Sequence, residues 1–237
     1  ILTQAGFLHA YALGVLLWGC LGPQGWLTCV FYLIGGSAVT KVRTTEKEAK
    51  GIAEGRGGAR GPENVWGSAA AAALAAIGTV LFPKLVRAPM MPQLTPHIDI
   101  DIDLGVCFHK GYVASLATKL SDTFASEIGK AFGKRTFLVT TLKPVPPGTE
   151  GAVSLEGTLA GVLGSILQAA VGIGLGVVES NALVICIIAA FIANYVESLL
   201  GATTQGKFRW LTNEVINFAN TAVGAAIGIG MGIFLQV

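Results

Sequence analysis

Charged residues are scarce in this sequence, and so are histidine and cysteine. Lys, Arg, Asp and Glu make up 13% of the 237 residues and hydrophobic residues 52%, whereas a soluble domain carries about 25% charged residues. The three histidines and four cysteines form no CxxC or other zinc-ligand spacing, which argues against a zinc site or a disulfide framework. The net charge of +2 is too small to indicate nucleic acid as a partner.

Long apolar stretches, by contrast, recur along the chain and alternate with short charged ones, a pattern typical of repeated membrane crossing. They occupy residues 5–20, 25–40, 63–82, 105–132, 152–177, 181–200 and 214–236. The first two are short and are expected to form a hairpin at Gly22-Pro23. GxxxG spacings at 157–161, 172–176 and 224–228 predict close helix packing. We therefore predict one all-α domain over 1–237, a polytopic transmembrane bundle of about seven helices.

The charged loops divide unevenly between the two sides that seven crossings define. The N-terminus and loops 41–62, 133–151 and 201–213 share one side and hold 11 of the 16 basic residues. Loops 21–24, 83–104 and 178–180 hold two basic residues against four acids, and we predict no role for 83–104. The basic side is therefore expected to face the cytoplasm, or the stroma in a plastid. The start at Ile1 instead of Met suggests a processed chain, whose targeting segment would precede it.

A glycine-rich segment on the basic side, GRGGARGP at 55–62, is the first candidate anion site. Glycines let successive backbone N–H groups turn towards one anion, and Arg56 and Arg60 can add bidentate contacts. Pro62 suits the first turn of the following helix, whose N-terminal dipole would face the same anion. A flexible, positively charged loop is an equally good interpretation of this spacing.

Acids at membrane depth form the second candidate. They are costly there and so indicate function. Lys119, Asp122 and Ser126 fall on one helical stripe, whereas Glu127 lies about 140° from Asp122 at the usual 3.6 residues per turn. A straight helix cannot direct both carboxylates at one ion. Either the helix breaks here or the two acids have different roles. An internal Lys119–Asp122 ion pair is the purely structural alternative.

The proline- and glycine-rich stretch at 140–158 supplies a third set of candidates. Lys143 offers a point charge suited to phosphate. Glu156 lies just inside an apolar helix, where an unpaired carboxylate is costly. For Thr149 and Glu150, ordinary turn and helix-cap chemistry is the alternative. On the sixth apolar segment Glu197 shares a helix face with Asn194, and for the asparagine hydrogen bonding between helices is as good an explanation.

The combination of carboxylates, cations and hydroxyls predicts phosphoryl transfer, in which catalysis is mostly positioning and electrostatics. Mg²⁺ usually binds through one or two carboxylates together with substrate phosphates. No Walker A, protein-kinase, GxSxG or HExxH pattern occurs. No histidine stands near the acids to act as a base. This favours an acceptor that is already a phosphate anion over an alcohol.

Several blocks resemble a known family, the plastid and cyanobacterial phytyl-phosphate kinases of vitamin E synthesis. They include KEAKGIAEGRGGARGPENVWGSAA at 47–70, GYVASLATKLSDTFASEIGKAFGK at 111–134, FLVTTLKPVPPGTEGAVSLEGTLAG at 137–161 and IANYVESLLGA at 192–202. The resemblance covers most of the chain from about residue 35 but not 83–105. It implies a plastid or cyanobacterial membrane enzyme that phosphorylates phytyl phosphate to phytyl diphosphate. It also implies Mg²⁺, and CTP as donor by kinship with polyprenol kinases, for tocopherol and phylloquinone synthesis and phytol recycling.

We assign roles to these residues as hypotheses. The expected catalytic residues are Lys119, Asp122, Glu127, Lys143 and Glu156. The expected Mg²⁺ ligands are Asp122 and Glu127, with Glu156 or Glu197 as a further ligand. Nucleotide and phosphate contacts are expected from Arg56, Gly57, Gly58, Arg60, Asn64, Ser68, Thr141, Gly148, Thr149, Glu150, Gly151, Ser154 and Asn194. A transporter or flippase for an isoprenoid phosphate, and a CTP-dependent transferase that makes a CDP-linked lipid, remain alternatives. Nothing in the sequence indicates an oligomer.

Overall fold

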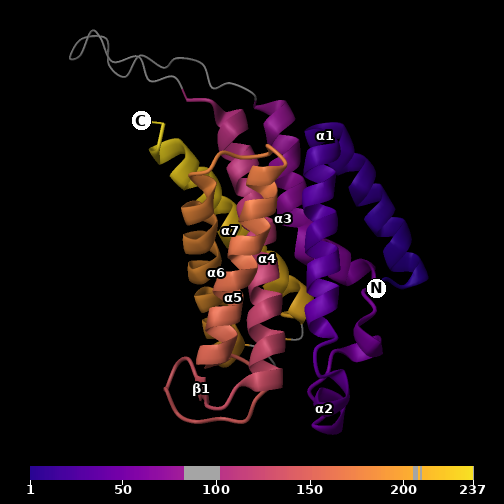
Figure 1. Cartoon of the computed structure of the whole chain (residues 1–237), viewed down its shortest axis with the longest axis vertical. Helices are drawn as coiled ribbons and strands as arrows, with labels where there is room; N and C mark the ends of the chain where they lie inside the picture. The colour runs from indigo at the N-terminus through magenta and orange to yellow at the C-terminus, as the bar shows by residue number, and fades with distance from the viewer. Residues whose placement is uncertain (83–101, 205–207, 209, 237) are drawn as a thin grey trace, which may run out of the picture.

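The computed structural model describes residues 1–82, 102–204, 208 and 210–236. This part of the chain is helical apart from one short hairpin (Figure 1). The helices are α1 (Gln4–Thr40), α2 (Thr44–Ala49), α3 (Pro62–Leu81), α4 (Leu104–Phe132), α5 (Leu155–Gly174), α6 (Ala182–Thr204) and α7 (Asn213–Phe234), with a 3₁₀ turn, η1, at Gly55–Gly58. Strands β1 (Thr136–Leu138) and β2 (Ala152–Ser154) pair antiparallel. The prediction of an all-α membrane bundle is confirmed.

The first two apolar segments are the limbs of one kinked helix, α1. Gly22 leaves the helical region with φ 68° and ψ −169°, and Pro23 has no N–H to donate to the preceding turn. The limbs fold back on each other at this point (Figure 1). The Trp18 and Trp26 rings, with centroids 5.7 Å apart, pack between them. The expected hairpin at Gly22-Pro23 is present.

Helix α4 lies at the centre and packs against α1, α3, α5, α6 and α7. Its Tyr112, Leu116 and Leu120 are fully buried. Those five neighbours are the helices, within the described residues, that are long and apolar enough to cross a membrane. Helix α4 carries charged side chains instead, and its neighbours shield them from lipid. It runs unbroken through Asp122 and Glu127, so the two acids point to different sides.

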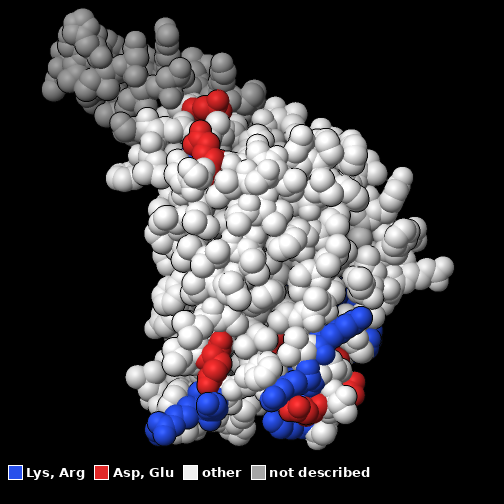
Figure 2. All heavy atoms as spheres, in the orientation of Figure 1, with Lys and Arg blue, Asp and Glu red and all other residues white. Residues whose placement is uncertain are grey.

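The ends of the bundle are chemically different. The Thr3 amide donates to the Arg60 carbonyl at 3.0 Å, which places the N-terminal residues beside the glycine-rich loop. At the opposite end Gln236 Nε2 donates to the Asp103 carbonyl at 3.3 Å. Lysines and arginines gather at the end that carries α2 and the hairpin, below a broad uncharged band (Figure 2). Many large apolar side chains are exposed, Phe7 and Phe191 among them, as expected for a surface that faces lipid. Described loops that alternate along the chain therefore lie at opposite ends of the bundle (Figure 1). Several charged loop residues lie outside the described residues, namely Lys84, Arg87, Asp99, Asp101, Lys207 and Arg209.

The GxxxG glycines bring neighbouring helices close to α4. A Cβ at Gly228 of α7 would lie 2.7 Å from Ala114 Cβ and 2.9 Å from the Lys110 carbonyl oxygen. Gly157 and Gly161 of α5 face α4 in the same way, and so do Gly172 and Gly224. Gly176 is different, because it has φ 72° beyond the end of α5 and would place its Cβ in open space.

We expect Gly228→Ala to lower the free energy of unfolding by about 1–3 kcal/mol, because the added methyl overpacks the contact with α4. Gly230→Ala on the same helix is the matched control, since a Cβ there meets nothing within 4 Å. It should raise stability by roughly 0.5–1 kcal/mol through helix propensity. Unfolding of both proteins in mixed detergent micelles measures the difference, and equal effects would contradict the packing role.

Candidate functional site

A cavity of about 630 Å³ opens at the basic end of the bundle. Residues from α1, α3, α4, α5, α6 and α7 line it, together with the loops around 51–60 and 147–154. The cavity therefore gathers segments that are far apart in the sequence. The charged residues in its wall are Glu54, Arg56, Arg60, Lys119, Asp122, Glu127, Lys130, Glu150, Glu197 and Glu214.

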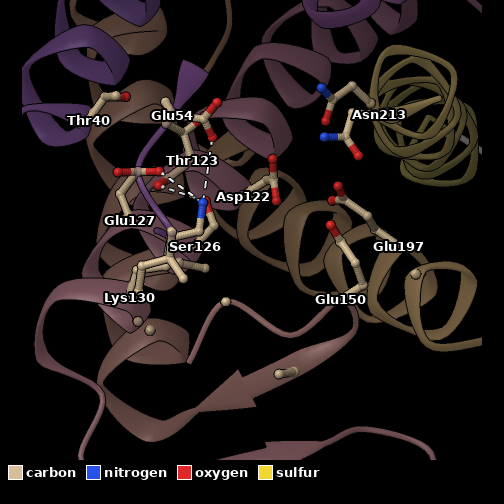
Figure 3. A pocket seen from close by; sticks show the side chains of 18 of the residues that line it. Thr40, Glu54, Asp122, Thr123, Ser126, Glu127, Lys130, Glu150, Glu197 and Asn213 are labelled. Carbon is tan, nitrogen blue, oxygen red and sulfur yellow. Dashed lines mark hydrogen bonds and ion pairs between the residues drawn. The ribbon is translucent and has the colours of Figure 1, made fainter. Parts of the chain in front are cut away.

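Three carboxyl groups, from Asp122, Glu150 and Glu197, face one another across the cavity (Figure 3). We call them the central carboxylates. Lys119 Nζ lies 2.5 Å from Asp122 Oδ2 and 2.6 Å from Asn217 Oδ1. The predicted Lys119–Asp122 ion pair is thus present, yet it neutralises one of three carboxyls, which leaves a site where a cation would be favourable.

Glu150 reaches this group from the loop that precedes β2. Loss of water at the cavity wall raises the pKa of its carboxyl; Lys130 opposes this rise, and the carboxylates of Glu54 and Asp122 add to it. A neighbouring cation would relieve this repulsion and favour the ionised carboxylate.

Glu127 belongs to a separate cluster on the other side of α4. Its side chain is 2% exposed and accepts a hydrogen bond from Lys47, which is equally buried. Lys47 also donates to the Thr40 carbonyl oxygen at 2.7 Å. Lys130 Nζ lies 3.4 Å from Glu127 Oε1 and 3.6 Å from Glu54 Oε1. Glu127 therefore ties α2 to α4, and two lysines already balance the carboxylate that we expected to bind metal.

Lys47 is a residue whose importance the sequence did not indicate. In the sequence it is one of several basic residues in the loop 41–62. Its partner Glu127 lies 80 positions further along the chain. Helical periodicity relates residues within one helix, so it carries no signal of such a pairing.

The glycine-rich loop forms the rim of the cavity. Arg56, Gly57 and Gly58 adopt φ values of 55°, 58° and 78° in succession, so the backbone is left-handed over three residues. Pro62 opens α3, as expected. Arg56 Nη2 contacts Glu63 Oε1 at 2.5 Å and Asn64 Oδ1 at 2.8 Å.

Arg60 is held in a different way. Its Nη1 donates to the Tyr32 hydroxyl at 2.7 Å, and its guanidinium lies 5.4 Å from the centre of the Tyr32 ring. Among the residues that the structure describes, no carboxylate forms a salt bridge with Arg60. Its positive charge therefore stays available for an anion.

Most of the residues expected at the site line this one cavity. These are Arg56, Gly58, Arg60, Asn64, Ser68, Lys119, Asp122, Glu127, Gly148, Thr149, Glu150, Gly151, Ser154, Asn194 and Glu197. Two of them also make local contacts, as the alternative interpretation predicted for Thr149. Ser154 Oγ accepts from the Gly157 amide at 3.1 Å and caps α5, and Thr149 Oγ1 donates to the Pro146 carbonyl at 2.7 Å.

The remaining four expected residues do not line the cavity. Thr141 and Lys143 are exposed on the turn that follows β1. Glu156 lies in the first turn of α5, partly buried, and Gly57 is exposed in η1. Thr141, Lys143 and Glu156 are close in sequence to residues that line the cavity, but the hairpin and the start of α5 place their side chains outside its wall.

The composition of the wall limits its chemistry. None of the described residues that line it is a histidine. No group of three His, Cys, Asp or Glu within the described ranges is arranged to hold a metal ion. The central carboxylates nonetheless suit Mg²⁺, which usually binds through one or two carboxylates and completes its coordination with water and substrate phosphates. The arrangement provides carboxylates for a divalent cation beside arginines for phosphate.

The chain has recognisable relatives. The family model described as integral membrane protein DUF92 matches residues 1–225. The chain is 51% identical over 231 residues to an uncharacterized membrane protein of Synechocystis, and the match covers 98% of this chain and 83% of that protein. It is 44% identical over 236 residues to the protein "VTE6, chloroplastic" of Arabidopsis thaliana; this match covers 99% of the chain but 66% of that relative. No solved structure gives a significant match to the chain. The resemblance to plastid and cyanobacterial proteins is confirmed.

Proposed function

The chain belongs to the integral membrane protein family DUF92, and from this membership we propose that it is a membrane kinase that phosphorylates an isoprenoid monophosphate. The acceptor is phytyl phosphate, the donor CTP, and the product phytyl diphosphate. The observation that carries the proposal is one cavity at the charged end of the bundle that holds carboxylates together with Arg60, which forms no salt bridge with a described carboxylate. The relationship to a chloroplastic relative supports it.

Different residues of the cavity would bind the metal ion and the phosphates of the two substrates. Asp122 and Glu197 would hold Mg²⁺, with Glu150 close by. When bound, the ion would neutralise charge that builds up on the transferred phosphoryl group. Lys119 fixes the Asp122 carboxyl from one side. Arg60 would bind the acceptor phosphate, because its guanidinium has the fork geometry that suits phosphate oxygens.

The membrane setting suits a long isoprenoid acceptor. Its hydrocarbon chain stays in lipid while its phosphate meets a water-soluble nucleotide at the charged end of the bundle. A monophosphate is already ionised at neutral pH, so the reaction needs no base to remove a proton. We place the protein in a plastid or cyanobacterial membrane, with the charged end towards the stroma or cytoplasm. The product would feed tocopherol and phylloquinone synthesis and allow released phytol to be reused.

Incubation of the purified protein with phytyl phosphate, CTP and Mg²⁺ tests the proposal. In the kinase reaction the γ-phosphoryl group leaves the β-phosphate oxygen of CTP and bonds to an acceptor phosphate oxygen, so CDP and phytyl diphosphate should form in equal amounts. Pyrophosphate and a CDP-linked lipid would instead identify a transferase. Movement of the prenyl phosphate across vesicles without any chemical product would identify a transporter.

We expect Gly36→Ala to weaken acceptor binding by displacing Arg60. A Cβ at Gly36 would lie 2.8 Å from Arg60 Nη2, the mobile end of a long side chain, so the fold should tolerate the change. The KM for the prenyl phosphate should rise about 5- to 10-fold, equal to roughly 1–1.4 kcal/mol. Gly35→Ala is the matched control, because its Cβ would meet Leu120 Cδ1 at an ordinary 3.5 Å. Equal KM values for the two variants would show that Arg60 does not bind the acceptor.

A further inference from the structure

A second hollow lies between the two limbs of α1 and the start of α3. It measures about 80 Å³ and has a mainly apolar lining. We call it the apolar groove. The residues that shape it include Leu13, Gly14, Leu17, Trp26, Val65 and Ala69. The kink at Gly22 creates this space, because it splits α1 into two limbs that diverge from one corner (Figure 1).

The apolar groove adjoins the polar cavity. Tyr32, Arg60, Asn64 and Ser68 line both. Arg60 therefore lies where the groove and the cavity meet. Its guanidinium contacts Tyr32, and no described carboxylate forms a salt bridge with it. An apolar slot that meets an unneutralised cation suits a hydrocarbon chain that ends in an anion such as a phosphate.

The dimensions of the groove limit how much of such a chain it can take. Since one water-sized group needs roughly 10–15 Å³ of this kind of cavity volume, a hollow of about 80 Å³ holds only a handful of heavy atoms. That is enough for the beginning of an isoprenoid chain but not for all of it. The first limb of α1 exposes Tyr11 and Val15, so a longer chain can continue from the groove along a lipid-facing surface.

We propose that the apolar groove binds the first isoprene unit of the acceptor, with the phosphate turned to Arg60 and the remaining chain in the bilayer. This inference rests on the proposed kinase function for the identity of the acceptor. Specificity would then reside in the unit next to the phosphate, and the length of the chain beyond it would matter little. A phospholipid is a poor occupant, because its two acyl chains and glycerol are too wide for a slot of this size.

Photocrosslinking tests occupancy without relying on turnover. The probe is a geranylgeranyl monophosphate with a diazirine on its first isoprene unit, irradiated with the full-length protein in lipid nanodiscs. We expect label on α1 and on the start of α3, lost on addition of unlabelled phytyl phosphate but not of phosphatidic acid. Label on other helices, or equal displacement by phosphatidic acid, would overturn the assignment, the latter by showing a general lipid crevice.

A pair of glycines on the first limb of α1 provides the functional test. A Cβ at Gly14 would lie 3.1 Å from Trp26 Nε1 inside the groove, whereas at Gly19 it would meet nothing within 4 Å. Gly14→Leu should raise the KM for phytyl phosphate by about tenfold or more, the scale of adding a few carbons to an apolar pocket. The KM for CTP should stay unchanged, and Gly19→Leu should resemble the wild type.

The outcomes separate the two proposals. If the groove is labelled and unlabelled phytyl phosphate removes the label, but no prenyl phosphate is turned over, the kinase proposal is refuted and the groove proposal stands. If both leucine variants turn over phytyl phosphate normally and with equal KM values, the groove proposal is refuted and the kinase proposal stands. If Gly14→Leu fails to fold, as shown by its thermal unfolding in detergent, the labelling pattern of the wild-type protein decides alone.

Discussion

Replacing Asp122 by asparagine should lower the rate of phosphoryl transfer about 100- to 1000-fold, equivalent to roughly 2.7–4 kcal/mol in the barrier. Asparagine has nearly the same shape and keeps an oxygen that can accept from Lys119 Nζ, now 2.5 Å from Asp122 Oδ2. The fold should therefore persist. What is lost is one negative charge among the central carboxylates, where we propose that Mg²⁺ binds with the substrate phosphates.

Initial rates with phytyl phosphate and CTP, measured over a range of Mg²⁺ concentrations, reveal this loss. Half-maximal activity should require more Mg²⁺ in the variant than in the wild type. A variant that kept full activity at low Mg²⁺ would exclude Asp122 as a ligand.

Glu156→Gln is the informative comparison. It also removes a carboxylate at the charged end of the bundle, but from a residue that does not line the cavity. We expect activity close to that of the wild type. An effect as large as that of Asp122→Asn would favour the assignment that the sequence alone suggested for Glu156.

Hydropathy and charge predicted the bundle well because both act locally along the chain. The apolar segments became helices, the Gly22-Pro23 step became the kink in α1, and the loops fell at alternate ends. Acids at membrane depth also led directly to Asp122 and Glu197, since a charge buried in a membrane helix needs a reason. The 140° offset on a straight helix correctly separated Asp122 from Glu127.

The partners of these side chains could not be predicted in the same way. A helical wheel gives the face of a residue but not the helix that covers it. Glu127 was assigned to metal as an acid at membrane depth, whereas Lys47 reaches it from a segment 80 residues earlier. Lys143 was assigned as a point charge suited to phosphate and Glu156 as a costly carboxylate inside an apolar helix, yet Lys143 is exposed on a turn and neither residue lines the cavity. Tertiary packing decides both cases.

The second large effect is expected from the buried pair that ties α2 to α4. Lys47→Met should lower the free energy of unfolding by about 3–5 kcal/mol, because it leaves the Glu127 carboxylate buried without its closest cation. Lys130, 3.4 Å from Glu127 Oε1, compensates in part and sets the effect towards the lower end. Lys41→Met is the control, since it removes the same charge from an exposed position at the same end of the bundle. It should change stability by less than about 0.5 kcal/mol.

A double variant distinguishes a structural pair from a catalytic carboxylate. Combining Lys47→Met with Glu127→Gln removes both buried charges, so most of the lost stability should return, as it does when a buried ion pair is replaced as a unit. Unfolding of the four proteins of this cycle in mixed micelles gives the coupling energy. If Glu127 served as a metal ligand, the double variant would be stable but inactive. We expect it to be both stable and active, because the central carboxylates lie on the other face of α4 and do not depend on the charge of Glu127.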